Sequence, residues 1–218
     1  MKKALVAGAT GLVGRELVRI LLNQKEYAKV TVLVRRRMNL DHPKLEQLVV
    51  DYDRLEGLAG ELVEGAALYC TLGTTMKQAG SKELFELVDY EYPMTLGRMA
   101  KRYGAEQMLI VTAMGAKRGS LFYYNRVKGK VEEELGKLGL PKLCIFRPSL
   151  LLGDRQEKRA GEQAAMKAAD KLPFLFSGPL ERYKPIRAEQ VAAAMAAAAN
   201  DNIEGTRIYE SRDIAAMA

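Results

Sequence analysis

Histidine and cysteine are scarce in this 218-residue sequence, which has one His, two Cys and no tryptophan. Cys70 and Cys144 each lie inside an apolar run, YCTL and LCIF, where a small buried hydrophobe is the expected role. The two cysteines do not have metal-ligand spacing, so we expect neither a structural zinc nor a disulfide framework. His42 precedes Pro43 in a polar stretch, and without a second histidine a histidine-based triad is not expected.

Long hydrophobic runs are also missing. Nothing approaches the roughly 18 consecutive apolar residues that a membrane helix needs. The start, Met1-Lys2-Lys3, is followed by a short apolar stretch broken at Gly8, which is too brief for the core of a signal peptide. We therefore expect a cytoplasmic protein without a membrane partner.

Basic and acidic residues are not separated into different parts of the sequence, although the formal net charge is +7. Basic residues mostly alternate with acidic ones, as in KGKVEEELGK, which indicates a solvated mixed surface rather than a nucleic-acid interface. One dense basic cluster, Arg35 to Arg37, needs a separate explanation.

Short β-branched runs alternate with helical patterns over the first two thirds of the chain. The predicted strands are Lys3 to Ala7, Lys29 to Val34, Gln47 to Asp51, Ala66 to Thr71, Gln107 to Thr112 and Leu143 to Arg147. The predicted helices are Leu12 to Asn23, a short turn near Asp53 to Glu64, Ser81 to Tyr103 and Phe122 to Leu138. This alternation predicts an α/β fold with a doubly wound parallel sheet of the Rossmann type.

Two details follow from this pattern. Pro93 falls inside the third helix and predicts two helical pieces with a break near Leu87 to Asp89. In the common strand order, the strands of Cys70 and Cys144 lie on either side of the Gln107 to Thr112 strand, too far apart for a disulfide.

The last third changes character. We expect a single domain over 1–218, with a cofactor-binding core at 1–148 and a small C-terminal cap on the substrate side at 149–218. Within that cap, Leu150 to Pro185 is rich in charge, Gly and Pro and has one helical patch. The predicted elements are that patch at Ala160 to Lys171, a helix at Ala188 to Asn200 and a closing strand at Thr206 to Glu210.

The stretch AGATGLVG places Gly8, Gly11 and Gly14 where the first strand signal gives way to a helix signal. In a first βα turn, the first glycine permits the tight turn and the second lets a phosphate approach the backbone. The third lets the helix pack closely on the sheet, and the helix amino end attracts the anion. We expect this turn, including Thr10, Leu12 and Val13, to bind a dinucleotide.

The second strand indicates which dinucleotide. An NAD site usually carries an acid about 20 residues beyond the glycines, whereas arginine there accommodates a 2′-phosphate. VTVLVRRR ends on Arg35 and Arg36, with no acid before Asp41. Planar guanidinium groups suit a phosphate dianion, so NADP(H) is the predicted cofactor.

A YxxxK pattern, Tyr124 to Lys128, opens the helix that follows the fifth strand. Residues four apart share a helix face, so the Lys128 ammonium is expected near the Tyr124 phenol and favours its ionised form. Neighbouring Tyr123 has Val127 four residues on and lacks this partner. We expect Tyr124 to give or take a proton during hydride transfer, Thr112 to hold the substrate oxygen, and Lys128 to bond the nicotinamide ribose.

Together these segments resemble the atypical branch of the short-chain dehydrogenase/reductase superfamily. GATGLVG is similar to its glycine motif, and YNRVK is similar to its active-site helix. LYCTLGTT, FYYNRVKGKVEEEL and FRPSLLLGDRQEKRAGE resemble the NAD(P)H-binding oxidoreductase family that includes the Tat-interacting metastasis-suppressor protein and its bacterial relatives. One difference is Thr112, where many superfamily members have serine; the β-branch of threonine adds a methyl group to the pocket.

The resemblance implies further site residues. By it, Asp51 and Tyr52 lie at the adenine, and Pro148 and Ser149 approach the nicotinamide. The adenosine and ribose path is implied to be lined by Thr71, Leu72 and Gly73. Thr74, Thr75 and Met76 are candidates to face the substrate, although a threonine pair after a strand is also a common helix cap. Arg155, Glu157 and Arg159 are expected to form an ion network that seats the cap.

Three functions remain open at this point. The first is an NADP(H)-dependent oxidoreductase that acts on a small carbonyl or alcohol. The second is an NADP(H)-binding regulator or assembly factor that presents a surface to a protein partner; the Tyr124 and Lys128 pair favours the enzyme. Nucleic-acid binding is the weakest, because the cofactor already explains the dense basic cluster. The substrate and the oligomeric state are not indicated.

Overall fold

Seven parallel strands form the central sheet of the computed structural model, which describes residues 1–152 and 183–218. The strand order is β3-β2-β1-β4-β5-β6-β9, and every neighbouring pair is parallel. The strands are β1 (Lys2–Ala7), β2 (Tyr27–Val34), β3 (Leu45–Val49), β4 (Ala66–Cys70), β5 (Gln107–Val111), β6 (Lys142–Arg147) and β9 (Gly205–Glu210). A separate parallel pair joins β7 (Leu151–Leu152) to β8 (Ile186–Arg187).

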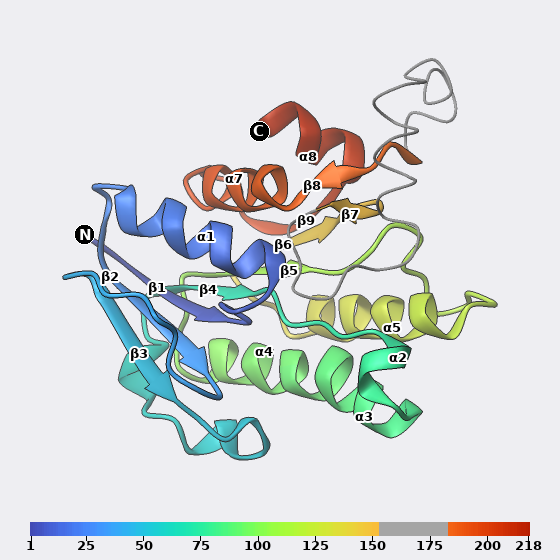
Figure 1. Cartoon of the computed structure of the whole chain (residues 1–218), viewed down its shortest axis with the longest axis horizontal. Coiled ribbons are helices and arrows are strands. Elements are labelled where there is room, and N and C mark those ends of the chain that lie inside the picture. Colours follow the sequence, from blue (N-terminus) through green and yellow to red (C-terminus); the bar gives the residue numbers. More distant parts are fainter. Residues whose placement is uncertain (153–182) are drawn as a thin grey trace.

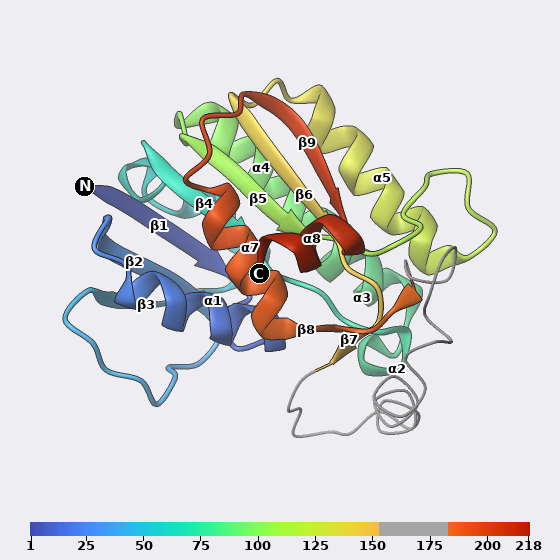
Figure 2. The ribbon, with the colours of Figure 1, turned by 90° about the horizontal axis from the view of Figure 1, so that it is seen from above.

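Helices cover both faces of the sheet (Figure 1). One face carries α1 (Leu12–Asn23), α7 (Ala188–Ala198) and α8 (Ser211–Met217), and α1 packs on α7. The other face carries α4 (Tyr92–Arg102) and α5 (Tyr123–Lys137), preceded by α2 (Met76–Ala79) and α3 (Lys82–Glu86). Shorter turns are η1 (Tyr52–Gly57), η2 (Gly60–Leu62) and η3 (Leu87–Glu91). The view from above shows α7 between α1 and α8 on this face (Figure 2).

Hydrophobic periodicity explains these two layers. In α1, Leu17, Val18 and Leu21 recur at helical spacing and are fully buried against the sheet. The central strands are apolar on both faces, as expected for a parallel sheet covered on both sides. Two clusters of buried side chains result, one on each side of the sheet, and they fix the strand ends at which Gly8 and Thr71 lie.

The predicted α/β doubly wound sheet is therefore confirmed. The first helix has the predicted bounds, and the predicted strands agree with the observed ones to within two residues at each end. The predicted short helical turn near 53–64 is two 3₁₀ turns, η1 and η2. The pattern did not indicate α2, α8 or the β7 and β8 pair.

The predicted division into two helical pieces with a break near Leu87 to Asp89 is wrong. Residues 82–102 run as one continuous helix in which η3 is a π-helical turn. Pro93 has no N–H to donate to the Asp89 carbonyl four residues earlier, and the Tyr92 N–H instead reaches back to the Leu87 carbonyl. The proline thus widens the helix and does not interrupt it.

The C-terminal region contributes to the main layers. β9 is the seventh strand of the sheet, and α7 packs on α1 within one helix layer. The part predicted as a cap at 149–218 thus includes elements of the central fold. The predicted helical patch Ala160 to Lys171 and the Arg155, Glu157 and Arg159 network lie outside the described residues, and the division at 148 stays a prediction.

Both cysteines are buried and free, on the strands β4 and β6 that lie on either side of β5, as predicted. Burial raises the pKa of the Cys70 thiol to about 11. Within residues 1–152 and 183–218, no helix is long and apolar enough to span a bilayer.

One buried polar pair gives a direct test of this packing. The hydroxyls of Tyr27 and Tyr69 lie 2.7 Å apart, and both side chains are fully buried. Tyr69→Phe leaves the Tyr27 hydroxyl without this partner, so we expect a loss of about 1–3 kcal/mol of unfolding free energy. The double variant Tyr27→Phe/Tyr69→Phe should lose less than the two single losses added together. Urea denaturation measures both, and fully additive losses would contradict the pairing.

Candidate cofactor and active site

The turn after β1 is pressed against the end of β4. Gly8 has φ +88°, and a Cβ built on it would lie 2.6 Å from the Thr71 carbonyl carbon. A Cβ on Gly14 would overlap the Gly8 carbonyl oxygen and lie 2.7 Å from Thr71 Oγ1. Thr71 Oγ1 donates a hydrogen bond to the Ala7 carbonyl at 3.0 Å. The first and third glycines therefore allow two loops to meet at the carboxyl edge of the sheet.

The start of α1 is suited to an anion. Gly11 is the N-cap residue and supplies no capping side chain, and no acidic residue lies in the first helical turn. The first N–H groups of a helix lack intrahelical partners and carry the positive end of its dipole. Thr10, Leu12 and Val13 belong to this turn, and Val13 is buried. The geometry fits a pyrophosphate held by backbone N–H groups.

Arg35 and Arg36 follow β2 directly and are exposed. β2 pairs with β1, so the two arginines lie at the same sheet edge as the glycine turn. The positive charge of Arg35 acts on the hydroxyls of Tyr52 and Tyr92, which indicates that these groups share one neighbourhood.

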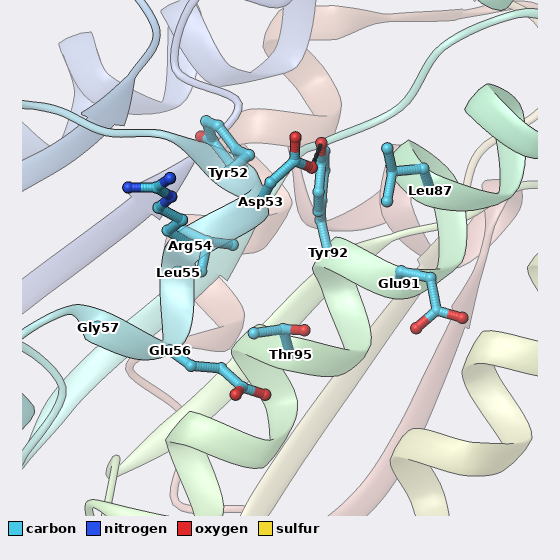
Figure 3. A pocket seen from close by; sticks show the side chains of 10 residues that line it. All are labelled: Tyr52, Asp53, Arg54, Leu55, Glu56, Gly57, Leu87, Glu91, Tyr92 and Thr95. Atoms are coloured by element: carbon cyan, nitrogen blue, oxygen red, sulfur yellow. Dashed lines mark hydrogen bonds between the residues drawn. The ribbon is translucent and has the colours of Figure 1, made fainter.

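A cavity of about 490 Å³ lies beside this neighbourhood, between η1 and the η3–α4 helix (Figure 3). Tyr92 donates a hydrogen bond to Asp53 Oδ1 at 2.6 Å, and its ring lies 5.3 Å from that of Tyr52. Burial, followed by the Asp53 carboxylate, raises the pKa of Tyr92 to about 12. The Tyr52 hydroxyl donates to the Leu33 carbonyl at 2.8 Å, and burial raises the pKa of this phenol as well.

Of the predicted adenine residues, Tyr52 lines this cavity and exposed Asp51 caps η1 by accepting from the Asp53 N–H. Sequence reasoning missed Asp53 and Tyr92, which come from segments 39 residues apart. The available signal was the aromatic run YEYP at the start of the α4 helix. This run indicates a site only once η1 is known to pack against α4.

The Tyr124 ring lies in the first turn of α5 and is half-buried against Phe85, with ring centroids 5.6 Å apart. Tyr123 packs on the same Phe85 ring, with centroids 5.9 Å apart, but its hydroxyl donates to Glu86 Oε1 at 3.1 Å. Lys128 is one helical turn after Tyr124, and the two groups interact electrostatically. The structure thus brings together the predicted pair and gives Tyr123 a different partner.

The Lys128 ammonium is almost fully buried and forms an ion pair with Asp89 Oδ1 at 2.7 Å. Burial lowers the pKa of Lys128, but the Asp89 carboxylate and the Tyr124 hydroxyl outweigh this effect, so the net direction is upward. Asp89 lies in the π-helical turn η3, and its Oδ2 accepts from the Thr74 N–H at 2.9 Å. Asp89 was not predicted, although an acid four residues before Pro93 on a buried helix face was a visible signal.

Thr112 is engaged within the protein. Its hydroxyl is buried and donates to Glu132 Oε1 at 2.5 Å. Glu132 also pairs with Arg147 at 2.6 Å, and Arg147 with Glu210 at 2.9 Å, so the hydroxyl belongs to a network that ties α5 to β6 and β9. The two residues that follow, Ala113 and Met114, carry no hydroxyl. The predicted role of Thr112 toward a substrate oxygen therefore competes with a bond that the structure already contains.

The remaining predicted residues lie at the carboxyl edge of the sheet. Thr71, Leu72 and Gly73 follow β4, and a Cβ on Gly73 would lie 3.9 Å from Lys128 Nζ. Thr75 caps α2 by accepting from the Gln78 N–H, which is the capping role left open above, and Met76 begins that helix and is exposed.

Pro148 and Ser149 follow β6. The Pro148 carbonyl accepts from the Met114 N–H, and the Ser149 hydroxyl donates to the Lys184 carbonyl and accepts from Ser211. Their contact with a nicotinamide stays a prediction. No group of three or more potential metal ligands is found among the described residues.

Known proteins match this chain closely enough to give its family. The NAD(P)H-binding family matches residues 8–202. Protein HTATIP2 of Rattus norvegicus is 35% identical over 175 residues, 79% of this chain and 72% of its own length. The chain belongs to the NAD(P)H-binding atypical short-chain dehydrogenases/reductases. The mitochondrial protein FMP52-1 of Scheffersomyces stipitis is 28% identical over 97% of this chain and 96% of its own length.

Solved structures of other proteins share the fold. MoeE5 in complex with UDP-glucose and NAD superposes with a TM-score of 0.73 over 98% of this chain and 79% of that one, at 13% identity. WbmH of Bordetella bronchiseptica in complex with NAD+ gives 0.70 over 97% and 76%, at 19% identity. At these identities the likeness concerns the fold alone.

The close contact at the glycine turn predicts a selective effect of one methyl group. Gly14→Ala forces α1 away from the Gly8 carbonyl and Thr71, so we expect at least a tenfold loss of dinucleotide affinity in calorimetry. The control is Gly136→Ala, an exposed α5 glycine whose Cβ would meet nothing within 4 Å. It should keep full affinity, and equal losses in both variants would contradict the assignment.

Proposed function

We propose that this protein is an NADP(H)-dependent oxidoreductase that transfers a hydride between the nicotinamide and a small carbonyl or alcohol substrate. The observation that carries the proposal is the Tyr124 and Lys128 pair on one face of α5, with the Lys128 ammonium held charged in a buried setting. A protein that only binds the cofactor has no need of a phenol and an ammonium so placed.

The cofactor form rests on the arginines. Family membership establishes NAD(P)H binding, and the turn at Gly8 and Gly14 fits a pyrophosphate because a side chain there would fill the space. Exposed Arg35 and Arg36 at the end of β2 supply two guanidinium groups for a 2′-phosphate. We therefore propose NADP(H) over NAD(H).

The chemistry that the bound cofactor supplies is a hydride, delivered to the carbonyl carbon in reduction and recovered from the alcohol carbon in the reverse direction. Tyr124 donates its phenolic proton to the substrate oxygen as the C–H bond forms, and it takes the proton back in oxidation. Lys128 stabilises the phenolate that remains. An ammonium has three N–H donors, so its pairing with Asp89 is compatible with a further bond to the nicotinamide ribose.

The other predicted roles belong to this proposal. Asp51 and Tyr52 lie at the adenine, Thr71 to Gly73 along the ribose path, and Pro148 and Ser149 near the nicotinamide. Thr112 supports the substrate oxygen if its hydroxyl can be shared between Glu132 and substrate. We also propose a cytoplasmic protein with a small-molecule substrate, although several yeast relatives are named as mitochondrial.

One observation favours a second function, an NADP(H)-binding regulator or assembly factor without turnover. The Thr112 hydroxyl is committed to Glu132, and the next two residues offer no replacement. A site lacking that second hydrogen bond to the substrate oxygen would bind the cofactor normally and present its surface to a partner protein. Turnover decides between the two functions.

Cofactor preference is tested by removing the two arginines. Arg35→Ala/Arg36→Ala should weaken NADPH binding by at least tenfold and leave NADH binding nearly unchanged, because only NADPH carries the 2′-phosphate. Calorimetric titration measures both. The control is Arg19→Ala, an exposed arginine on α1 that pairs with Glu16. Equal losses for the two nucleotides would contradict the assignment.

The proton donor is tested by removing one oxygen atom. Tyr124→Phe should leave the NADPH dissociation constant within about twofold and reduce carbonyl-dependent NADPH oxidation by at least 100-fold, within the range of general acid catalysis. A panel of aldehydes, ketones and quinones supplies the substrates. The control, Tyr123→Phe, loses only the bonds to α3 and should remain active. Full activity of Tyr124→Phe would place the chemistry elsewhere.

A further inference from the structure

Asp89 is the one carboxylate that meets the Lys128 ammonium in the described residues. Its side chain is fully buried, and its two oxygens have different partners: Oδ1 lies 2.7 Å from Lys128 Nζ, and Oδ2 accepts from the Thr74 N–H. The carboxylate therefore connects three segments, namely η3, the loop after β4 and the helix α5. It is placed there by the π-helical turn at which Pro93 widens the helix.

Few other charges reach the ammonium. The titratable groups that act on Lys128 are Asp89 from η3, Tyr124 from its own helix and Cys70 from β4. Burial raises the pKa of the Cys70 thiol to about 11, so the thiol is neutral at physiological pH. Among the residues that the structure describes, Asp89 is thus the only ionised partner that offsets the burial of Lys128.

We propose that Asp89 is a positioning residue of the active site, which keeps the amine of Lys128 charged and fixes it beside Tyr124. This rests on the proposed function, since a charged Lys128 matters there for proton transfer by Tyr124. A lone ammonium at this depth loses its hydration and therefore loses its proton more easily. A carboxylate at contact distance stabilises the protonated amine. The hydrogen bond from Thr74 fixes the carboxylate, and so the loop after β4 also helps to locate the amine.

Asp89→Asn keeps the shape of the side chain and removes its charge, so it tests this role. In the wild type, Lys128 stays protonated well into the alkaline range. In the variant, burial dominates and the amine loses its proton at lower pH. We expect the alkaline limb of the kcat/KM profile for carbonyl reduction to move down by at least one pH unit, with the NADPH dissociation constant within about threefold of the wild type.

Two variants separate charge from shape. Asp89→Glu retains a carboxylate, so its alkaline limb should stay at the wild-type position even if kcat falls. Glu133→Gln removes an exposed carboxylate on the same helix and should change neither kcat nor the profile. A fall in kcat for Asp89→Asn without movement of the limb would show a purely structural role and overturn the proposal.

The pH dependence of unfolding gives a readout that needs neither cofactor nor substrate. In the wild type the raised pKa of Lys128 contributes stability below its unfolded value of ~10.4, and this is lost as pH rises through the folded value. In Asp89→Asn the folded pKa falls below that value, so the unfolded chain binds more protons and stability should rise with pH up to ~10.4. Parallel curves for the two proteins would overturn the proposal.

A variant that does not fold is also informative. If Asp89→Asn fails to fold at pH 7, Asp89→Asn/Lys128→Met should fold, because the isolated buried charge is gone; failure of both would contradict the proposal. Failure of the proposed function has a different signature. A wild-type protein that binds NADPH but turns over no substrate contradicts the oxidoreductase, whereas the unfolding curves still decide whether Asp89 sets the charge of Lys128.

Discussion

The close approach of the β1–α1 turn to the end of β4 is the constraint on which the site depends. The Thr71 backbone lies where a Cβ on Gly8 would have to be, and the Gly8 carbonyl and Thr71 Oγ1 lie where a Cβ on Gly14 would have to be. Because of this contact, the amino end of α1 points at the edge where β1 and β4 end side by side. A pyrophosphate at this edge meets backbone N–H groups rather than side chains.

In the proposed complex, the two ends of the dinucleotide would contact different parts of the chain. The β2 arginines and the Tyr52, Asp53 and Tyr92 group lie on the β3 side of the sheet. The Tyr124 and Lys128 pair lies beyond β5, on α5, and the ion pair with Asp89 joins it to the loop after β4. The loop after β4 therefore contacts the glycine turn through Thr71, and through the Thr74 N–H it holds Asp89, the partner of Lys128. The two parts of the candidate site thus share one loop.

The seven strands of the sheet, the long helices and the glycine turn were predictable because each follows from local periodicity or from a fixed spacing of glycines. The Tyr124 and Lys128 pair was predictable for the same reason, since four residues define one helix face. Asp89 and Tyr92 were not, because their roles arise only when η3 and α4 are packed against α5 and η1. For Thr112 only the position could be predicted. The pattern placed it at the end of β5, but its hydrogen bond to Glu132, 20 residues away, depends on how α5 packs on the sheet.

The C-terminal part illustrates how composition misleads. Ala188 to Ala198 is rich in alanine and only weakly amphipathic, so its sequence does not indicate which face of the helix is buried. The structure shows that it packs beside α1. Five of the six residues of β9 are exposed, yet this strand closes the sheet beside β6. Small side chains are what allow α1 and α7 to share one layer.

The central claim is that the glycine turn and the β2 arginines form one site for NADP(H). Parallel calorimetric titration of the wild-type protein with NADPH and NADH tests it most directly. The account predicts saturable binding at one site per chain with NADPH tighter by at least tenfold. Binding of neither nucleotide, or tighter binding of NADH, would contradict it.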